Sequence, residues 1–215
     1  MQQPSLYGPQ QSWFARYLER REQRRPDLVA RELRRLLLAG LRGSVIEVGC
    51  GDGRAFELYP AEVERVLAVE PDPTARELAF DRARDASVPI EVAEGFAEAL
   101  PAADEEFDAA VVVWVLCSVV DPLASLRELR RVLRPDGELR FYEHVRSKQP
   151  LFRALQRAGD ALFWTRALGG CRTTRDTVKA IREAGFDLVA VEGGFHSSSV
   201  LTITSAPYVV GVARR

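Results

Sequence analysis

The chain has 215 residues, 47% of them hydrophobic, and a formal net charge of -1. This length and apolar content suffice to bury the core of one α/β domain, and the balanced charge argues against nucleic acid as a partner. The three cysteines, Cys50, Cys117 and Cys171, form no C-x-x-C pair, which argues against a disulfide framework or a zinc site and favours a reducing cytoplasm. We therefore expect a single cytoplasmic domain, 1–215, without a metal.

The chain begins with a region, 1–43, in which we expect a helical cap and a lead-in helix. Leucines between Leu28 and Leu41 fall close to one helical face, and Gly43 is placed to end the helix. A strand, a glycine loop, a short helix, a second strand and a further helix are predicted next, at 44–48, 49–53, 56–58, 65–70 and 74–84.

The alternation of strands and helices continues to residue 145. The run 109–120 contains no charged residue, as expected of a strand buried on both faces, and it is too short to cross a membrane. The rhythm predicts a doubly wound, mostly parallel, Rossmann-like α/β sheet. The elements predicted here are strands at 90–95, 107–115 and 138–145, a helix opened by Asp121 and Pro122, and a turn at 135–137.

One short stretch, VIEVGCGDG at 45–53, carries three glycines at alternate positions, Gly49, Gly51 and Gly53. Glycine lets a ligand lie against the backbone and lets the chain turn sharply into the following helix. The loop follows the first strand, at the carboxyl edge where such sheets bind ligands. Glu70 ends the next strand about 20 residues later, where an acid can accept hydrogen bonds from ribose hydroxyls. Loop and acid together predict a nucleoside site.

The kind of nucleoside depends on spacing and charge. Dinucleotide-binding loops have the pattern G-x-G-x-x-G, whereas this loop is G-x-G-x-G. Glu47 precedes the loop and Asp52 lies in it, so a pyrophosphate would meet two negative charges, whereas the sulfonium and ammonium of S-adenosylmethionine would be attracted. S-adenosylmethionine is favoured. A nicotinamide-dependent oxidoreductase and a non-catalytic nucleoside-binding module remain as alternatives.

Five motifs, VIEVGCGDG, VLAVEPDP, EGFAEALP, FDAAVVVWVLCSV and RELRRVLRPDGELRFYEH, resemble those of the class I S-adenosylmethionine-dependent methyltransferases, over roughly Leu36 to Val145. Further motifs, VLCSVVDP and GGCRTTRDTVKAIREAGF, are similar to a small subfamily that includes alkyl-thiol S-methyltransferases, with quinone and phospholipid-amine methyltransferases as neighbours. The resemblance implies a seven-stranded sheet whose last strand is antiparallel, with the final two strands at 186–194 and 207–215.

The resemblance also implies an enzyme that moves a methyl group from S-adenosylmethionine to a small, hydrophobic acceptor (a thiol, quinol or amine) and releases S-adenosylhomocysteine. No metal is implied. The cofactor-binding residues carried over are Glu47, Gly49, Gly51 and Gly53 for the methionine part, Glu70 for the ribose, Pro71, Phe96 and Ala97 around the adenine, and Val113 and Trp114 near the sulfonium.

The acceptor side of the site has one candidate catalytic residue, His144, at the end of the fifth strand. A histidine there can serve as a general base, or it can merely line the sheet end. Cys117 has no activating partner at a telling spacing, so a packed thiol is favoured. We expect residues 44–145 to form the cofactor-binding core, and 146–215 to form an acceptor-side insertion with aromatic side chains, followed by the final two strands.

Overall fold

The computed structural model describes residues 27–161, 170–197 and 200–215. Within them a seven-stranded sheet has the order β3-β2-β1-β4-β5-β7-β6, and β7 runs antiparallel to both of its neighbours. The other pairings are parallel. The predicted mostly parallel sheet with an antiparallel last strand is confirmed. The strands are β1 (Gly43–Val48), β2 (Val63–Val69), β3 (Ile90–Ala93), β4 (Phe107–Val113), β5 (Leu133–His144), β6 (Asp187–Phe195) and β7 (Pro207–Arg214).

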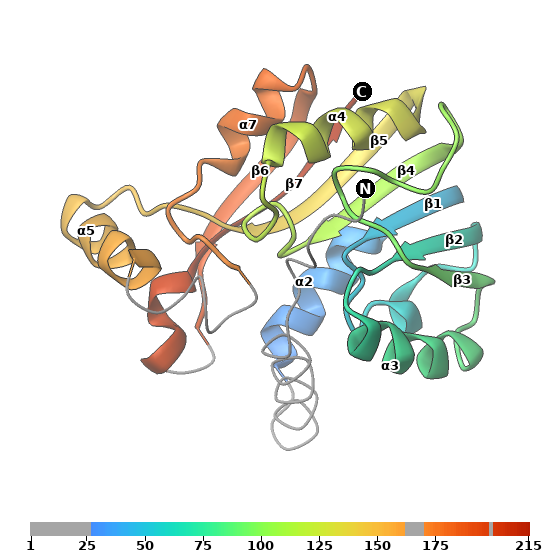
Figure 1. The fold of residues 1–215 in the computed structure, drawn as a ribbon, viewed down its shortest axis with the longest axis horizontal. Helices are drawn as coiled ribbons and strands as arrows, with labels where there is room; N and C mark the ends of the chain where they lie inside the picture. Colours follow the sequence, from blue (N-terminus) through green and yellow to red (C-terminus); the bar gives the residue numbers. More distant parts are fainter. Residues whose placement is uncertain (1–26, 162–169, 198–199) are drawn as a thin grey trace, which may run out of the picture.

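Helices cover both faces of the sheet (Figure 1). Successive strand residues point to opposite faces, so Val45 packs with the cluster that includes α2 and α3, whereas Ile46 packs with the cluster that includes α4 and α7. The sheet is therefore the middle of three layers. The helices are α2 (Leu28–Leu38), α3 (Pro73–Arg84), α4 (Pro122–Val132), α5 (Pro150–Gly159) and α7 (Thr177–Glu183), with short 3-10 turns η1 (Phe56–Leu58) and η3 (Val200–Ser205).

Aspartates begin several helices, and the sequence predicts this for the helix that Asp121 opens. Asp121 accepts hydrogen bonds from the backbone N–H groups of Leu123 (2.9 Å) and Ala124 (3.0 Å), and Pro122 occupies the first turn of α4. A proline there loses no hydrogen bond, because the first amides of a helix have no partner inside it. Helix α4 thus starts after the loop 114–121 that follows β4, and its Leu126 and Leu129 pack against the sheet.

Two predicted boundaries are wrong. Helix α2 ends at Leu38 rather than at Gly43, which opens β1 instead, and Leu28 and Leu36 are exposed rather than on the inner face. Strand β5 begins at Leu133, and its register with β4 passes from Leu133 directly to Glu138. The residues predicted as a turn, 135–137, therefore interrupt one continuous strand. The reason is that Leu133, which precedes them, already pairs with Phe107 of β4.

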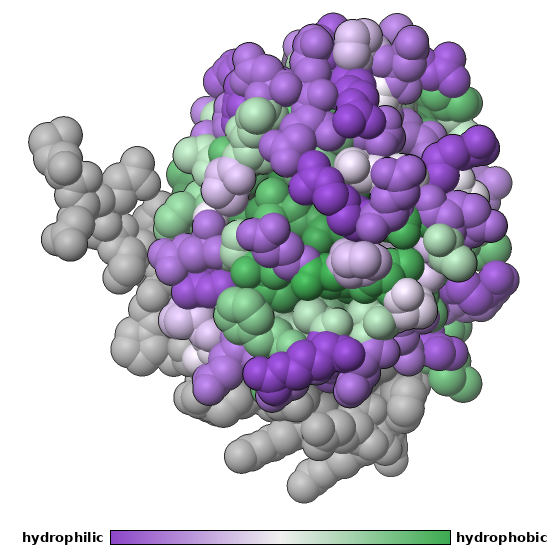
Figure 2. Space-filling view, turned by 90° about the vertical axis from the view of Figure 1, so that its right-hand side faces the viewer, coloured by the Kyte–Doolittle hydropathy of each residue, from purple (hydrophilic) through white to green (hydrophobic). Residues whose placement is uncertain are grey.

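The side of the molecule that faces right in Figure 1 is polar around an apolar centre (Figure 2). The arrows of β1 and β2 point away from this side, so it lies at the amino ends of these strands. Among the described residues no helix combines the length and apolar character needed to cross a bilayer. The sequence offers two aromatic-rich candidates for a cap over the site, and of these Tyr7, Trp13, Phe14 and Tyr17 near the start of the chain and Phe163 and Trp164 of the insertion lie outside the described residues.

Candidate functional site

The glycine loop follows β1 in a left-handed conformation. Gly49, Gly51 and Gly53 have φ angles of +68°, +58° and +79°. A Cβ at Gly49 would lie 2.5 Å from Val115, and one at Gly53 would lie 2.6 Å from Phe56, whereas one at Gly51 would meet no atom within 4 Å. The outer two glycines therefore allow close packing within the protein. The middle one leaves open space beside the backbone, where a ligand can approach.

Glu70 joins this loop to the end of β2. Its carboxylate accepts hydrogen bonds from the N–H of Gly51 (2.8 Å) and from the N–H of Asp72 (2.9 Å). The side chain is buried, and burial raises its pKa to about 7 despite the two amide donors. Sequence reasoning placed Glu70 at the strand end correctly. It did not show that Glu70 also holds the loop.

Glu47 is a second buried carboxyl group below the loop. The Tyr59 hydroxyl donates to it at 2.8 Å, and burial raises its pKa to about 7, opposed by Tyr59 and by the Arg34 guanidinium. The charge of Glu70 adds to this rise. Two carboxyl groups that repel one another in a desolvated place favour a cationic partner.

Asp52 does not add to that negative region, which corrects one step of the sequence argument. Its carboxylate pairs with Arg54 at 2.9 Å and with Arg82 at 3.2 Å. Its charge is therefore compensated inside the protein, and repulsion of a pyrophosphate rests on Glu47 and on the glycine spacing. Spacing along the sequence could not show this, because Arg82 belongs to α3, which comes after β2 in the chain.

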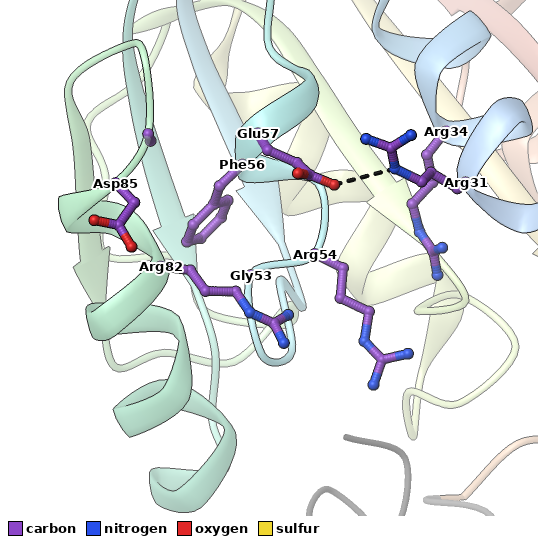
Figure 3. A pocket seen from close by; sticks show the side chains of 9 residues that line it. Arg31, Arg34, Gly53, Arg54, Phe56, Glu57, Arg82 and Asp85 are labelled. Atoms are coloured by element: carbon purple, nitrogen blue, oxygen red, sulfur yellow. Dashed lines mark hydrogen bonds and ion pairs between the residues drawn. The ribbon is translucent and has the colours of Figure 1, made fainter. Parts of the chain in front are cut away.

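A cavity of about 370 Å³ opens next to the loop at Gly53. Most of the charged side chains around it are arginines, and Arg31 forms an ion pair with Glu57 at 3.1 Å (Figure 3). Arg54 and Arg82 neutralise Asp52 and Arg31 pairs with Glu57, so most of the positive charge around this cavity is compensated within the protein. The lining residues are Arg31, Arg34, Gly53, Arg54, Phe56, Glu57, Arg82, Asp85 and Ala86.

The residues predicted around the adenine lie at the carboxyl edge of neighbouring strands. Pro71 follows β2 and is half-buried, and Phe96 and Ala97 follow β3, with Phe96 37% exposed and Ala97 buried. The N–H of Ala99 donates to the Phe96 carbonyl at 3.0 Å and closes a turn.

Trp114 lies at the end of β4, next to the half-buried Val113. Its φ angle is +58°, which is rare for a bulky residue and typical of positions that serve a site. The indole stacks on the ring of His144 with centroids 5.1 Å apart, and the guanidinium of Arg34 lies 4.7 Å from the indole centroid. Trp114 therefore contacts both Arg34 and His144 at the carboxyl edge of the sheet.

His144 ends β5 and faces two cysteines. Its Nδ1 lies 3.8 Å from the Sγ of Cys117 and 3.6 Å from the Sγ of Cys171, and the two sulfurs are 3.6 Å apart. Both cysteines are buried. Sequence reasoning missed this cluster. Cys117 follows β4 and His144 ends the adjacent β5, so these two could have been paired, but Cys171 lies 27 residues beyond His144 and no local pattern places it beside them.

Glu143 is a further buried acid that sequence reasoning did not assign. Its carboxylate accepts hydrogen bonds from the N–H groups of Val115 and Leu116, both at 2.9 Å, and of Cys117, at 3.0 Å. Burial raises the pKa of Glu143, and the three amide donors lower it. The side chain fixes the loop that leads from Trp114 to Cys117.

Comparisons with known proteins agree with this architecture. A family model described as a methyltransferase domain matches residues 46–141. Thiol S-methyltransferase TMT1B of Rattus norvegicus is 35% identical over 161 residues, and TMT1A of Homo sapiens is 32% identical over 160 residues. Each of these matches covers 69% of this chain and spans 62% of the relative's length. A ubiquinone biosynthesis O-methyltransferase of Methylobacterium is 33% identical over 100 residues, or 46% of this chain and 39% of the relative.

Solved structures show the same relationship. An S-adenosylmethionine-dependent methyltransferase of Thermotoga maritima is 26% identical and superimposes with a TM-score of 0.66, covering 94% of this chain and 97% of the other. A geranyl diphosphate methyltransferase, 17% identical, shares the fold with a TM-score of 0.68, covering 89% of this chain and 86% of the other. By its fold, its motifs and these relatives, the chain belongs to the class I S-adenosylmethionine-dependent methyltransferases.

Proposed function

We propose that this chain transfers a methyl group from S-adenosylmethionine to the sulfur of a small, hydrophobic thiol. The observation that carries the cofactor part is the pair of buried carboxyl groups, Glu47 and Glu70, beneath a loop whose middle glycine borders open space. The thiol is supported by the TMT1 relatives, which are thiol S-methyltransferases. A quinol or an amine is the rival acceptor, because ubiquinone methyltransferases are among the relatives.

In this proposal each part of the cofactor has its own residues. Glu47 and the loop hold the methionine part, with its positive charges near a desolvated acid, and Glu70 accepts hydrogen bonds from the ribose hydroxyls through lone pairs that the two amides leave free. Pro71, Phe96 and Ala97 border the adenine, which stacks on apolar surface. Val113 and Trp114 border the sulfonium. The protein alone supplies every one of these contacts.

The proposed chemistry is an in-line displacement. The acceptor sulfur loses its proton and attacks the methyl carbon, while the bond from that carbon to the sulfonium breaks and leaves neutral S-adenosylhomocysteine. A thiolate is a strong nucleophile, so much of the rate can come from positioning and from excluding water. We place His144 on the acceptor side of the methyl group, because its ring stacks on Trp114 at the end of the adjacent strand.

We extend the proposal to the organisation of the whole chain. Residues 1–215 form one domain, in which 1–43 is a helical cap and lead-in helix, 44–145 the cofactor-binding core, and 146–215 the acceptor-side insertion with the last two strands. The protein works in the cytoplasm on a small molecule and not on nucleic acid. The near-neutral charge supports this, because nothing in the composition provides a basic surface for a polyanion.

Ligand-induced stabilisation tests the cofactor. S-adenosylhomocysteine at a hundredfold excess over its Kd should stabilise the full chain by about 2.7 kcal/mol, because it binds the native state alone. NAD at the same concentration should leave the melting temperature unchanged. Equal stabilisation by NAD would contradict the cofactor assignment.

Product formation then tests the acceptor. With a simple alkyl thiol, a quinol and an amine offered separately, release of S-adenosylhomocysteine should be fastest with the thiol. Turnover of the quinol but not of the thiol would retain the methyltransferase and reject the thiol.

A further inference from the structure

The cluster of Cys117, His144 and Cys171 has the dimensions of a metal site. In tetrahedral zinc sites the Zn–S bonds are about 2.3 Å and the Zn–N bonds about 2.0–2.1 Å, which places neighbouring ligand atoms about 3.5–3.8 Å apart. The three separations here are 3.6, 3.8 and 3.6 Å. Both sulfurs and the ring nitrogen therefore already lie close to three corners of such a tetrahedron.

We infer that Cys117, Cys171 and Nδ1 of His144 bind Zn²⁺ and leave its fourth coordination position open. The cluster holds three ligand atoms among the described residues, each from a different part of the chain. Three protein ligands with an open position are the arrangement of catalytic rather than structural zinc sites. The inference departs from the expectation of a metal-free protein, which considered only spacing along the sequence.

Charge favours the site. Each thiol releases one proton to solvent when it binds, and the imidazole binds as the neutral base, so Zn²⁺ with two thiolates carries no net charge. A buried ion that is neutralised by its own ligands avoids the large desolvation penalty of an isolated charge. The burial of Cys117 and Cys171 is therefore compatible with the metal.

The surrounding backbone holds the ligands in place. Three amides on the Glu143 carboxylate fix the loop before Cys117, and Arg175 donates to the carbonyls of Leu116 (2.6 Å) and Val119 (2.5 Å) on either side of it. The N–H of Arg172 donates to the Cys117 carbonyl at 2.8 Å. Such outer interactions are what orient ligands in metal sites.

Glycine allows the two cysteine segments to come this close. Gly170, immediately before Cys171, has a φ of +89°, and a Cβ there would lie 3.1 Å from the Ser118 carbonyl oxygen. A larger residue would press the segments apart. The close approach thus serves the contact between Cys117 and Cys171.

The open position suits the sulfur of the acceptor, a step that rests on the proposed function. A thiol R–SH that binds Zn²⁺ there gives up its proton to solvent and is held as a thiolate, because a coordinated thiol is deprotonated. The cluster lies at the ends of β4 and β5, and His144 stacks on Trp114, which we place near the sulfonium. The metal would then present a thiolate to the methyl group.

Metal analysis of the purified full chain tests the site. The wild type, freed of metal and kept reduced, should take up one equivalent of Zn²⁺. Loss of a partner outside the coordination sphere typically weakens metal binding about 10–100-fold. Cys117→Ser, Cys171→Ser and His144→Gln each remove a direct ligand, so each should weaken zinc binding by more than that. Cys50→Ser and His196→Gln are matched controls and should keep the wild-type zinc affinity. Uptake of zinc that is unaffected by the three ligand substitutions would overturn the site.

A second measurement uses the wild type alone, so that it does not depend on how the variants fold. Co²⁺ in place of zinc should give thiolate charge-transfer bands and the intense visible bands of tetrahedral cobalt, and an alkyl thiol added without S-adenosylmethionine should change them. A spectrum without thiolate bands overturns the metal site, and a spectrum that the thiol leaves unchanged overturns acceptor coordination. Neither result depends on methyl transfer, so failure here is distinguishable from failure of the proposed function.

Discussion

At the scale of single residues, the unusual feature of this protein is the pair of acids buried below the glycine loop. A carboxylate in a desolvated place is unfavourable unless donors or positive charge compensate it. Tyr59 compensates Glu47 in part, and two amides compensate Glu70 in part, yet burial still raises both pKa values to about 7. The compensation is incomplete, and a cationic ligand can complete it.

We predict that the affinity for S-adenosylmethionine rises with pH between about 5.5 and 8. In the free protein, Glu47 and Glu70 are largely protonated below pH 7, and a bound cation favours their ionised forms, so binding must expel protons in this window. Titration calorimetry in buffers of different ionisation enthalpy measures that release. Glu70→Gln should flatten the pH dependence, and Glu91→Gln, on an exposed position of β3, should not. A proton uptake on binding would contradict the argument.

At the scale of elements, the glycine loop shows how one short segment serves both packing and binding. Its outer glycines lie against Val115 and Phe56, and its middle glycine faces open space. The glycines therefore alternate in role along the loop: the two packed positions lie on either side of the one that borders open space.

Alanine at Gly53 should destabilise the protein more than alanine at Gly51. Both substitutions place a side chain in left-handed backbone, which costs about 1–2 kcal/mol, but only the first drives a Cβ to within 2.6 Å of the buried Phe56 ring. Overpacking adds about 1–3 kcal/mol. Urea denaturation measures the difference, and equal losses would mean that Phe56 moves aside. Gly51→Ala should chiefly weaken binding of S-adenosylhomocysteine, measured by calorimetry.

The alternation of strands and helices up to residue 145 was predictable because its central strands have the apolar content of buried strands, whereas the final two strands were implied by the family resemblance and β6 is mostly exposed. The glycine loop and Glu70 were predictable as a pair, because a parallel sheet brings the carboxyl ends of its strands to one edge. The end of α2 and the start of β5 were not. Local patterns leave such boundaries open, and the pairing of Leu133 with Phe107 across the sheet sets the second one.

At the scale of the whole molecule, the same two buried acids should make the unliganded protein less stable as pH rises from about 5 to 8. Their native pKa values, about 7, lie above the ordinary 4.5, so the native state binds more protons than the unfolded state. Stability is then highest below the unfolded pKa and falls as pH rises through the native one.

Urea denaturation at several pH values measures this slope, and Glu70→Gln should reduce it. A saturating concentration of S-adenosylhomocysteine should also reduce it, because the bound ammonium favours the ionised acids. A stability that increases over this pH range would contradict the prediction.

The class of fold, the position of the loop and the family could be predicted from the amino-acid sequence, because they depend on local periodicity, on glycine and on motifs that lie within one strand and its loop. Which charges are compensated and which side chains meet became visible in the folded chain. Asp52 is neutralised by Arg82, and Cys117 meets His144 and Cys171, through contacts between segments far apart in the chain. Such contacts depend on how helices and insertions pack back onto the sheet, and no spacing along one chain encodes that geometry locally.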